Sequence, residues 1–492
     1  MIVPLRGDQG SGSDGDPATG RDCTLFGTAA TSPDQSREWW SDAAATWLDG
    51  LRGAGEASDW ISLGRDDQPN VFAVRGAARR DRPVAETFRR AAGIGIRAAR
   101  QRGMDEAVFV MPPGLGDQQW QAAAEGLELG DWRMDRFFSE DQRGHAPPRR
   151  SLRESGPAEG TPPARRQAVR RGRILARAQN VARELVALPG NELTPAALAE
   201  FARREADETG FAVEVWEEGR LREEGFGAIL AVAAGSEQPP RLIVAEHSGR
   251  GGDPVVLVGK GVTFDTGGIS LKPPAKMGDM KYDMAGAAAA LCCIRAAAQL
   301  DIPQRLIAVV PAVENMPSGR AVKPGDVVVG LSGKSMEVDN TDAEGRLILS
   351  DALTFARELS PAAILDFATL TGACVVALGK HCAAVMTRHP EIADDLGRAG
   401  TQTGERTWPL PLWTDYRGQI DSEIADVKNT GGRAAGTITA GLFLAEFVGD
   451  DVPWAHLDIA GVAWSEKAGG WQPAGPAGYG VRLAHEWLRI RG

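Results

Sequence analysis

The sequence predicts an α/β protein, with a smaller N-terminal α/β domain and a larger C-terminal domain whose mainly parallel central sheet is flanked by helices. Three observations lead to this prediction. Short apolar runs alternate with longer stretches in which apolar residues recur at helical spacing. Several short runs are continuously apolar, which is typical of strands covered by helices on both faces. The chain has 492 residues, more than one hydrophobic core usually organises, so we expect two domains.

The first third of the chain predicts a disordered start followed by the smaller domain. Residues 1–22 are dominated by Gly, Ser and Asp without an apolar period, so we expect them to be disordered. Residues 23–142 are expected to form the N-terminal α/β domain. Apolar residues at helical spacing predict helices over 37–52 and 83–103, and the apolar run 106–113 predicts a short buried strand.

The rest of the chain predicts a linker and the larger domain. Residues 143–163 are rich in Pro, Gly and charge, and we interpret them as the linker. Residues 164–492 begin with a long helical pattern, after which Thr194 and Pro195 provide a cap and a first-turn Pro for the next helix. Strands are predicted at 211–216, 228–235, 241–247, 254–259, 305–314, 364–370, 382–387 and 456–464.

Composition and charge exclude several classes of protein. Hydrophobic residues make up 43% and charged residues 25% of the chain, as in ordinary globular proteins. No apolar stretch approaches the roughly 18 residues that span a bilayer, and the polar start lacks the apolar segment of a secretory signal. We therefore expect a cytoplasmic protein without a membrane partner. The net charge of −11 argues against nucleic acid as the main partner, although the arginines between Arg149 and Arg173 leave a local basic patch open.

A dense group of charged residues lies between positions 260 and 346. Its members are four carboxylates and three cations: Asp265, Asp283, Asp342, Glu344, Lys260, Lys272 and Arg346. They are expected at strand ends, and that edge of an α/β sheet is where ligands bind. Oxygen ligands suit hard or borderline divalent ions such as Zn²⁺, Mn²⁺ or Mg²⁺. Four carboxylates balance the charge of two such ions, which leaves Lys272 and Arg346 to favour anions formed during a reaction.

Within this group, residues 340–344 form the run Asn-Thr-Asp-Ala-Glu. Further characteristic segments begin at Glu314 (ENMPSGRAVKPGDV), Leu365 (LDFATLTGACVVALG), Asp426 (DVKNTGGRAAGTITAGLFL), Trp454 (WAHLDIAGVAW) and Gly475 (GPAGYGVRL). In these segments the chain resembles the leucine aminopeptidase family, the two-metal exopeptidases also called cytosol aminopeptidases. The resemblance begins near Asn180 and covers roughly the last two thirds of the chain. It implies that residues 164–492 are the catalytic domain of a metalloaminopeptidase that acts on peptides as a homohexamer.

The resemblance also implies a role for individual residues. Asp265 and Glu344 would bridge two metal ions, Lys260 and Asp283 would complete one ion, and Asp342 would complete the other. Lys260 would have to lose its proton in order to bind a metal. Lys272 would stabilise the gem-diolate, and Arg346 would hold a bicarbonate that carries the proton. The matching substrate-binding positions are Asn340, Leu370 and Gly372, with Met280 as an apolar wall of the pocket for the first side chain.

Other interpretations of the same motifs are weaker. Asp342 and Glu344 precede a predicted helix, where such residues often only cap the helix and offset its dipole. The run Phe264–Gly267 resembles an aspartic protease loop, but those loops occur in pairs and this chain has one copy. The run Gly259–Gly261 suggests a nucleotide loop, but Phe264 stands where a third Gly is needed.

Several residues outside the charged group also remain open to more than one interpretation. His381 and Cys382 suggest a Cys-His pair, but their apolar surroundings favour a structural role. His456 is expected to make a structural hydrogen bond, with lining of the cleft as the alternative. The loop 429–436 could cradle an anion with its backbone amides or form a turn or a subunit contact. For the whole protein, the alternative function is a nucleic-acid-binding or regulatory role of the kind some relatives have acquired.

Overall fold

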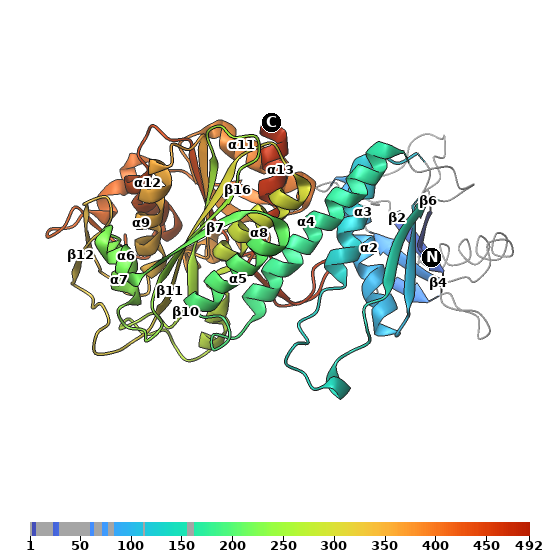
Figure 1. The fold of residues 1–492 in the computed structure, drawn as a ribbon, viewed down its shortest axis with the longest axis horizontal. Helices are drawn as coiled ribbons and strands as arrows, with labels where there is room; N and C mark the ends of the chain where they lie inside the picture. Colours follow the sequence, from blue (N-terminus) through green and yellow to red (C-terminus); the bar gives the residue numbers. More distant parts are fainter. Residues whose placement is uncertain are drawn as a thin grey trace. The chain divides into compact units, whose positions relative to one another are not determined.

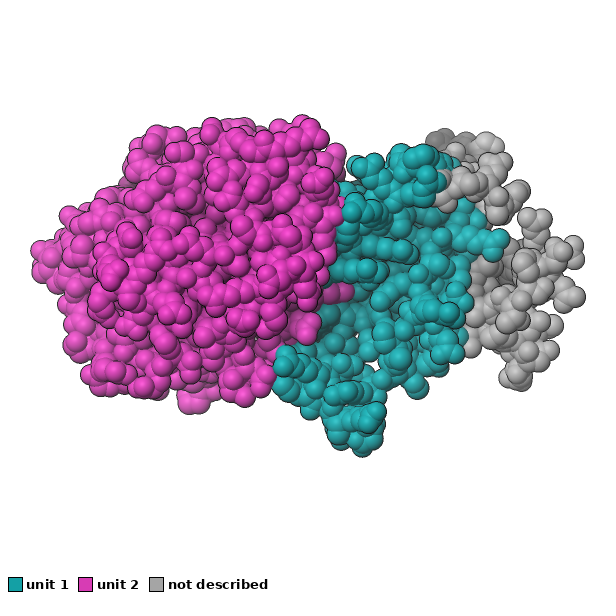
Figure 2. Space-filling view, viewed as in Figure 1, with its two compact units in different colours: residues 1–177, 467–474 teal, residues 178–466, 475–492 magenta. Residues whose placement is uncertain are grey.

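The computed structural model describes residues 83–111, 114–154 and 162–492, together with the backbone of four strands before residue 77 (Figure 1). The chain divides into two compact units, coloured separately in Figure 2. Unit 1 comprises residues Met1–Arg177 and Lys467–Ala474, and unit 2 comprises Ala178–Glu466 and Gly475–Gly492. No helix in the described part of the chain is long and apolar enough to cross a membrane.

Unit 1 is built on one mixed sheet. Its strands are β1 (Ile2–Leu5), β2 (Cys23–Thr28), β3 (Trp60–Ser62), β4 (Val71–Gly76), β5 (Glu106–Met111) and β6 (Arg149–Glu154). The strand order is β3-β4-β2-β1-β5-β6, and β5 runs parallel to both β1 and β6. The helical elements are α2 (Val84–Gln101), α3 (Asp117–Gly130), the 3₁₀ turn η1 (Glu140–Gln142) and the first part of α4 (Pro163–Ala187). Phe88 and Trp120 of the helices pack with Phe109 of β5 in the core of this unit.

A short segment from late in the sequence completes unit 1. Within Lys467–Ala474, Trp471 forms a small buried cluster with Leu129 and Ala176. Its indole nitrogen donates a hydrogen bond of 3.0 Å to the carboxylate of Glu86. Unit 1 is therefore not a continuous stretch of sequence.

The structure differs from the sequence-based expectation in two parts of unit 1. Residues 1–22, expected to be disordered, contain strand β1, while the rest of that range and the helix expected over 37–52 lie outside the described residues. The range 143–163, expected to be a linker, contains strand β6. Strand β6 lies at the edge of the sheet and is rich in arginine. Charged side chains are typical of edge strands, and here they made a strand resemble a linker.

Unit 2 is built on a large sheet that is parallel at its centre. Its strands are β7 (Ala212–Glu217), β8 (Arg241–His247), β9 (Val255–Gly259), β10 (Gly261–Asp265), β11 (Leu306–Asn315), β14 (Ala363–Ala368), β15 (Ala383–Thr387), β16 (Thr407–Pro409) and β18 (Trp454–Asp458). The order is β16-β15-β18-β14-β9-β11-β8-β7, with β10 paired to β11. Strands β18, β14, β9 and β11 are parallel neighbours, whereas β15, β8 and β7 join antiparallel. The predicted fold class is confirmed.

Helices lie on both sides of this sheet (Figure 1). They are α5 (Pro195–Thr209), α6 (Glu218–Glu223), α7 (Gly227–Ala233), α8 (Ala285–Leu300), α9 (Glu344–Glu358), α10 (Gly372–Leu378), α11 (Pro390–Thr403), α12 (Gly436–Val448) and α13 (Val481–Arg491), with the 3₁₀ segments η2 (Met277–Tyr282) and η3 (Thr414–Ile420). Short strands β12 (Val327–Val329), β13 (Ser335–Glu337) and β17 (Val427–Lys428) form a small sheet, and β19 (Trp464–Ser465) pairs with β20 (Gly475–Pro476). Thr194 caps α5 as predicted, by accepting a hydrogen bond from the Ala197 amide.

One predicted strand in unit 2 was wrong. Residues 228–235 belong mainly to helix α7 and not to a strand. Short apolar runs do not distinguish a buried strand from a buried helix, and the alanines in this run favour a helix. The predicted strand at 456–464 is divided into β18 and β19 by a turn at 459–463.

Close contact between α8 and the sheet positions the candidate site. A Cβ atom on Gly286 would lie 1.9 Å from the carbonyl oxygen of Phe367 in β14. A Cβ atom on Gly259, at the end of β9, would lie 2.5 Å from the carbonyl oxygen of Gly286. Only glycine fits at both positions, so α8 begins directly against the strand ends that precede Lys260.

Candidate metal centre

The charged residues of the predicted cluster arise from loops and helix starts at the carboxyl ends of central strands. Lys260 lies between β9 and β10, and Asp265 is the last residue of β10. Asp283 directly follows η2, and Glu344 is the first residue of α9. This is the edge at which open α/β sheets bind ligands, because loops from several strands meet there.

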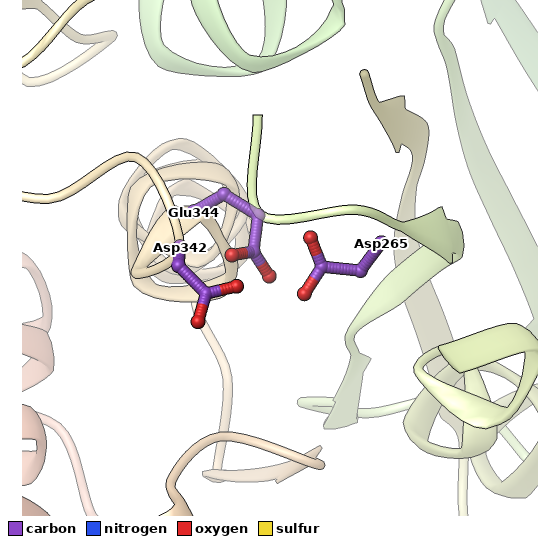
Figure 3. Close-up of side chains that lie close together, drawn as sticks. All are labelled: Asp265, Asp342 and Glu344. Atoms are coloured by element: carbon purple, nitrogen blue, oxygen red, sulfur yellow. The ribbon is translucent and has the colours of Figure 1, made fainter. Parts of the chain in front are cut away.

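Three carboxylates converge at the centre of the site. Each of Asp265, Asp342 and Glu344 offers one oxygen such that all three oxygens lie within 4.8 Å of one another. Figure 3 shows Asp342 and Glu344 extending from the start of α9 toward the carboxylate of Asp265 on the opposite side. The arrangement supplies oxygen ligands from two elements to one point, as a hard divalent ion requires.

The two lysines lie among these carboxylates. The Nζ atom of Lys260 is 2.8 Å from Asp283 Oδ2 and 2.9 Å from Glu344 Oε1. Lys272 Nζ lies 2.6 Å from Asp265 Oδ2 and also contacts Asp342. Burial disfavours both ammonium groups, but the surrounding carboxylates outweigh burial and raise the pKa of each lysine above its usual range. The carboxylate cluster therefore attracts positive charge strongly.

The pKa values and hydrogen bonding of the carboxylates indicate whether the cluster fits a metal ion. Burial, reinforced by the neighbouring Asp265, raises the pKa of Glu344 to about 8. Burial also raises the pKa of Asp283 to about 6, against the opposing effect of Lys260. Oxygen Oε2 of Glu344 is buried and accepts no hydrogen bond from any described residue. Buried carboxylates are normally paired or bound to a metal, so the residues present fit divalent cations.

Neutral side chains hold the ligands in place. The Asn315 amide donates to Asp265 Oδ1 at 2.8 Å and to the carbonyl oxygen of Thr341 at 3.0 Å. The Thr369 hydroxyl donates to Asp283 Oδ1 at 2.7 Å, and the Thr369 carbonyl oxygen accepts from Lys260 at 2.9 Å. Neither residue was predicted from the sequence to take part in the site. Asn315 was visible only by its position directly after the strand predicted at 305–314, and its pairing with Asp265 is seen in the structure.

Arg346 lies in the first turn of α9 and is buried. One terminal nitrogen donates a hydrogen bond of 2.6 Å to the carbonyl oxygen of Asn429. Its Nε atom is buried without a hydrogen-bond partner among the described residues. Burial lowers the pKa of Arg346 to about 10, so the guanidinium stays charged near neutral pH. A buried cation with a free donor is suited to an anion.

The residues expected to bind substrate lie on segments next to the ligands. Asn340 Oδ1 accepts a hydrogen bond of 2.8 Å from the Asp342 amide. The Leu370 amide points to Asp458 Oδ1 at 3.3 Å, and Gly372 is the exposed first residue of α10. Met280 is half-buried in η2, the segment that leads to Asp283.

The structure distinguishes between some alternative interpretations. The residue before α9 is Ala343, and the start of α9 has no side-chain cap, so Asp342 does not cap this helix. His456 is buried in β18, and its Nδ1 atom lies 2.5 Å from Asp366, so it makes a structural hydrogen bond. His381 is exposed and Cys382 half-buried at the start of β15, and neither forms part of the carboxylate cluster.

Comparisons with known proteins find similar sequences and a similar fold. A family model described as "Cytosol aminopeptidase family, catalytic domain" matches residues 180–485, and the model of that family's N-terminal domain matches residues 70–141. A "Probable cytosol aminopeptidase" from Syntrophotalea carbinolica is 51% identical over 411 residues, which cover 82% of each chain. Another, from Roseiflexus castenholzii, is 43% identical over 469 residues and covers 92% of this chain and 94% of its own. A solved structure, "Bottromycin maturation enzyme BotP in complex with Mn", is 35% identical with a TM-score of 0.79, over 90% of this chain and 96% of that chain.

Proposed function

We infer that this chain, which belongs to the cytosol aminopeptidase family and is a peptidase, removes N-terminal residues from peptides with the help of two divalent metal ions. The observation that carries the inference is the convergence of three carboxylate oxygens within 4.8 Å, with a fourth carboxylate joined through Lys260. The rival role in nucleic-acid binding or regulation has no support from the comparisons, and we do not propose it.

Five residues are proposed to hold the ions. Asp265 and Glu344 would be shared between both ions, Lys260 and Asp283 would complete one, and Asp342 would complete the other. Such ions, when bound, would supply a water acidic enough to attack at neutral pH and would polarise the scissile carbonyl. Mn²⁺ is favoured because the similar solved structure is a complex with Mn, and Zn²⁺ or Mg²⁺ would suit the same oxygen ligands.

Lys272 and Arg346 are proposed to act on charge and protons. Lys272 is more exposed than Lys260, with side-chain exposures of 19% and 4%, so its ammonium can approach a substrate oxygen. A fixed positive charge there stabilises the oxyanion that develops during attack. Arg346 would hold an anion such as bicarbonate through its unpaired donor, and this anion would accept the proton from the attacking water.

Substrate binding and assembly follow from the resemblance and remain proposals. Asn340, Leu370 and Gly372 would contact the peptide backbone, and Met280 would line the pocket for the first side chain. We also propose a cytoplasmic location, which the names of the relatives support, and a homohexamer.

The test of this function combines metal removal with a blocked substrate. Chelation should abolish release of N-terminal leucine from a peptide, and Mn²⁺ or Zn²⁺ should restore it, because the carboxylates need cations. Acetylation of the same peptide's N-terminus should abolish cleavage, because an aminopeptidase requires a free α-amine. Full activity of a sample shown to be metal-free by elemental analysis would refute the metal-dependent mechanism. Rapid internal cleavage of the acetylated peptide would refute the exopeptidase assignment.

A further inference from the structure

We propose that Asn429 is a positioning residue that fixes the loop carrying Asp342 for metal binding. Asn429 directly follows strand β17, and its side chain is fully buried. It belongs to the loop 429–436, to which the proposed function gives no role. The proposal rests on the two-metal function, and it assigns Asn429 to one of the two ions.

The Asn429 side chain bonds to the loop backbone on both sides of its amide. Oxygen Oδ1 accepts hydrogen bonds from the amides of Asp339, at 2.8 Å, and Asn340, at 3.2 Å. Nitrogen Nδ2 donates to the carbonyl oxygens of Asn340, at 2.7 Å, and Ala343, at 3.2 Å. These backbone groups lie in a loop without helix or strand pairing between β13 and α9. One side chain from about 90 residues away thus satisfies backbone groups that neighbouring strands would satisfy in a sheet.

An asparagine is required for this pattern. It offers an acceptor and two donors on one short planar group. An aspartate would keep the acceptor but would place a second oxygen against two carbonyl oxygens. An alanine would leave four loop backbone groups, two amides and two carbonyls, without their partner.

The loop matters because its backbone positions the Asp342 carboxylate. Thr341 is held separately, by hydrogen bonds with Ser270, Gly267 and Asn315. The backbone groups of Asp339, Asn340 and Ala343 on either side are held by Asn429. Asp265 is held by the amides of Gly267 and Asn315, and Asp283 by Thr369. The Asp342 carboxylate, in contrast, contacts Lys272, and its backbone amide is bonded to Asn340 of the same loop. Loss of the Asn429 amide should therefore displace Asp342 and leave the Lys260 and Asp283 side of the cluster intact.

The experiment titrates metal-free protein with Mn²⁺ by equilibrium dialysis, and bound metal is counted by elemental analysis. The wild type should bind two equivalents. Asn429→Ala and the isosteric Asn429→Asp should bind one equivalent as the wild type does and the other about 10–100-fold more weakly, as loss of a supporting partner typically causes. Their kcat should fall at limiting Mn²⁺ and recover as Mn²⁺ is raised. Should the alanine variant fail to fold, the aspartate variant carries the same prediction.

Gln179→Ala is the matched control. Gln179 is also a fully buried amide in unit 2, and it bonds to the carbonyl oxygen of Ala477 and to Arg482. This variant should lower the melting temperature without changing either Mn²⁺ affinity. Asn429 variants that lower the melting temperature but bind both Mn²⁺ ions like the wild type would overturn the positioning role. A wild type that binds a single equivalent would instead overturn the two-metal function, and the assignment of Asn429 to one ion with it.

Discussion

At the scale of single residues, Lys260 and Lys272 differ in their environment although both are lysines. Lys260 is enclosed by Asp283, Glu344 and the carbonyl oxygen of Thr369. Lys272 bridges Asp265 and Asp342 from a more open position. The first is suited to become part of a metal site, and the second to meet the substrate.

This difference predicts that substitution of a carboxylate causes loss of bound metal, whereas substitution of Lys272 lowers mainly kcat. Asp342→Ala removes a carboxylate from the cluster, so it should lose bound metal together with turnover. Lys272→Ala should keep both ions and lose on the order of 10²–10³-fold in kcat, the usual effect of removing a charge-stabilising donor. Bound metal per subunit and steady-state kinetics would be measured on both variants. A Lys272→Ala enzyme with the kcat of the wild type would exclude Lys272 from the mechanism.

The charged residues proposed for the site were visible in the sequence, whereas the neutral side chains that hold them in place were not. Carboxylates and lysines at strand ends are visible as a motif, and Asp342 and Glu344 are close to each other in the chain. Asn315, Thr369 and Asn429 carry no charge, and each reaches its partner only through the folded sheet. Periodicity and motif spacing contain no information on such contacts.

At the scale of elements, the close packing of α8 on the sheet predicts that one methyl group added at Gly286 lowers the stability of the protein. Gly286→Ala would place a Cβ atom 1.9 Å from a backbone oxygen of β14. Because a backbone cannot move aside as a side chain can, unfolding free energy should fall by about 1–3 kcal/mol or more. Urea denaturation would measure it. Gly219→Ala, at a helical position with no atom within 4 Å of the added Cβ, should change stability little or raise it slightly. Equal stability of the two variants would contradict the packing argument.

Most elements of the larger unit were predictable, for an identifiable reason. Strands β9, β11, β14 and β15 are largely apolar runs buried on both faces, as their pattern in the sequence predicts. Helix α7 is a short apolar run whose periodicity does not distinguish it from a buried strand, although its alanines favour a helix. Strand β6 was not predicted because its charged side chains are not typical of a strand, although it pairs with β5.

At the scale of the whole molecule, we propose that the two units are the two domains, and proteolysis can test which segment of the chain before unit 2 is most accessible. Residues 136–147 are exposed and, apart from η1, without regular structure. Within the range 130–187, trypsin should therefore cut first after Arg136 or Arg143. Arg149 and Arg153 should resist because β6 pairs with β5. Mass spectrometry of the first fragments would identify the sites. Initial cleavage within β6 would contradict its pairing with β5. Initial cleavage within α4, where unit 1 ends and unit 2 begins, would show that the domain boundary is more accessible than residues 136–147.

The discontinuity of unit 1 has a consequence for the order of events on the ribosome. Residues 83–177 emerge before residues 178–466, but Trp471, which bonds to Glu86 and packs against Leu129 and Ala176, is made only after them. At roughly 5–20 residues per second, the nascent unit waits on the order of tens of seconds for its final piece. Leu129 and Ala176 lack this packing partner for that time, while residues 178–466 are being synthesised. Synthesis of unit 2 thus reaches Glu466 before the unit that was begun first can be completed.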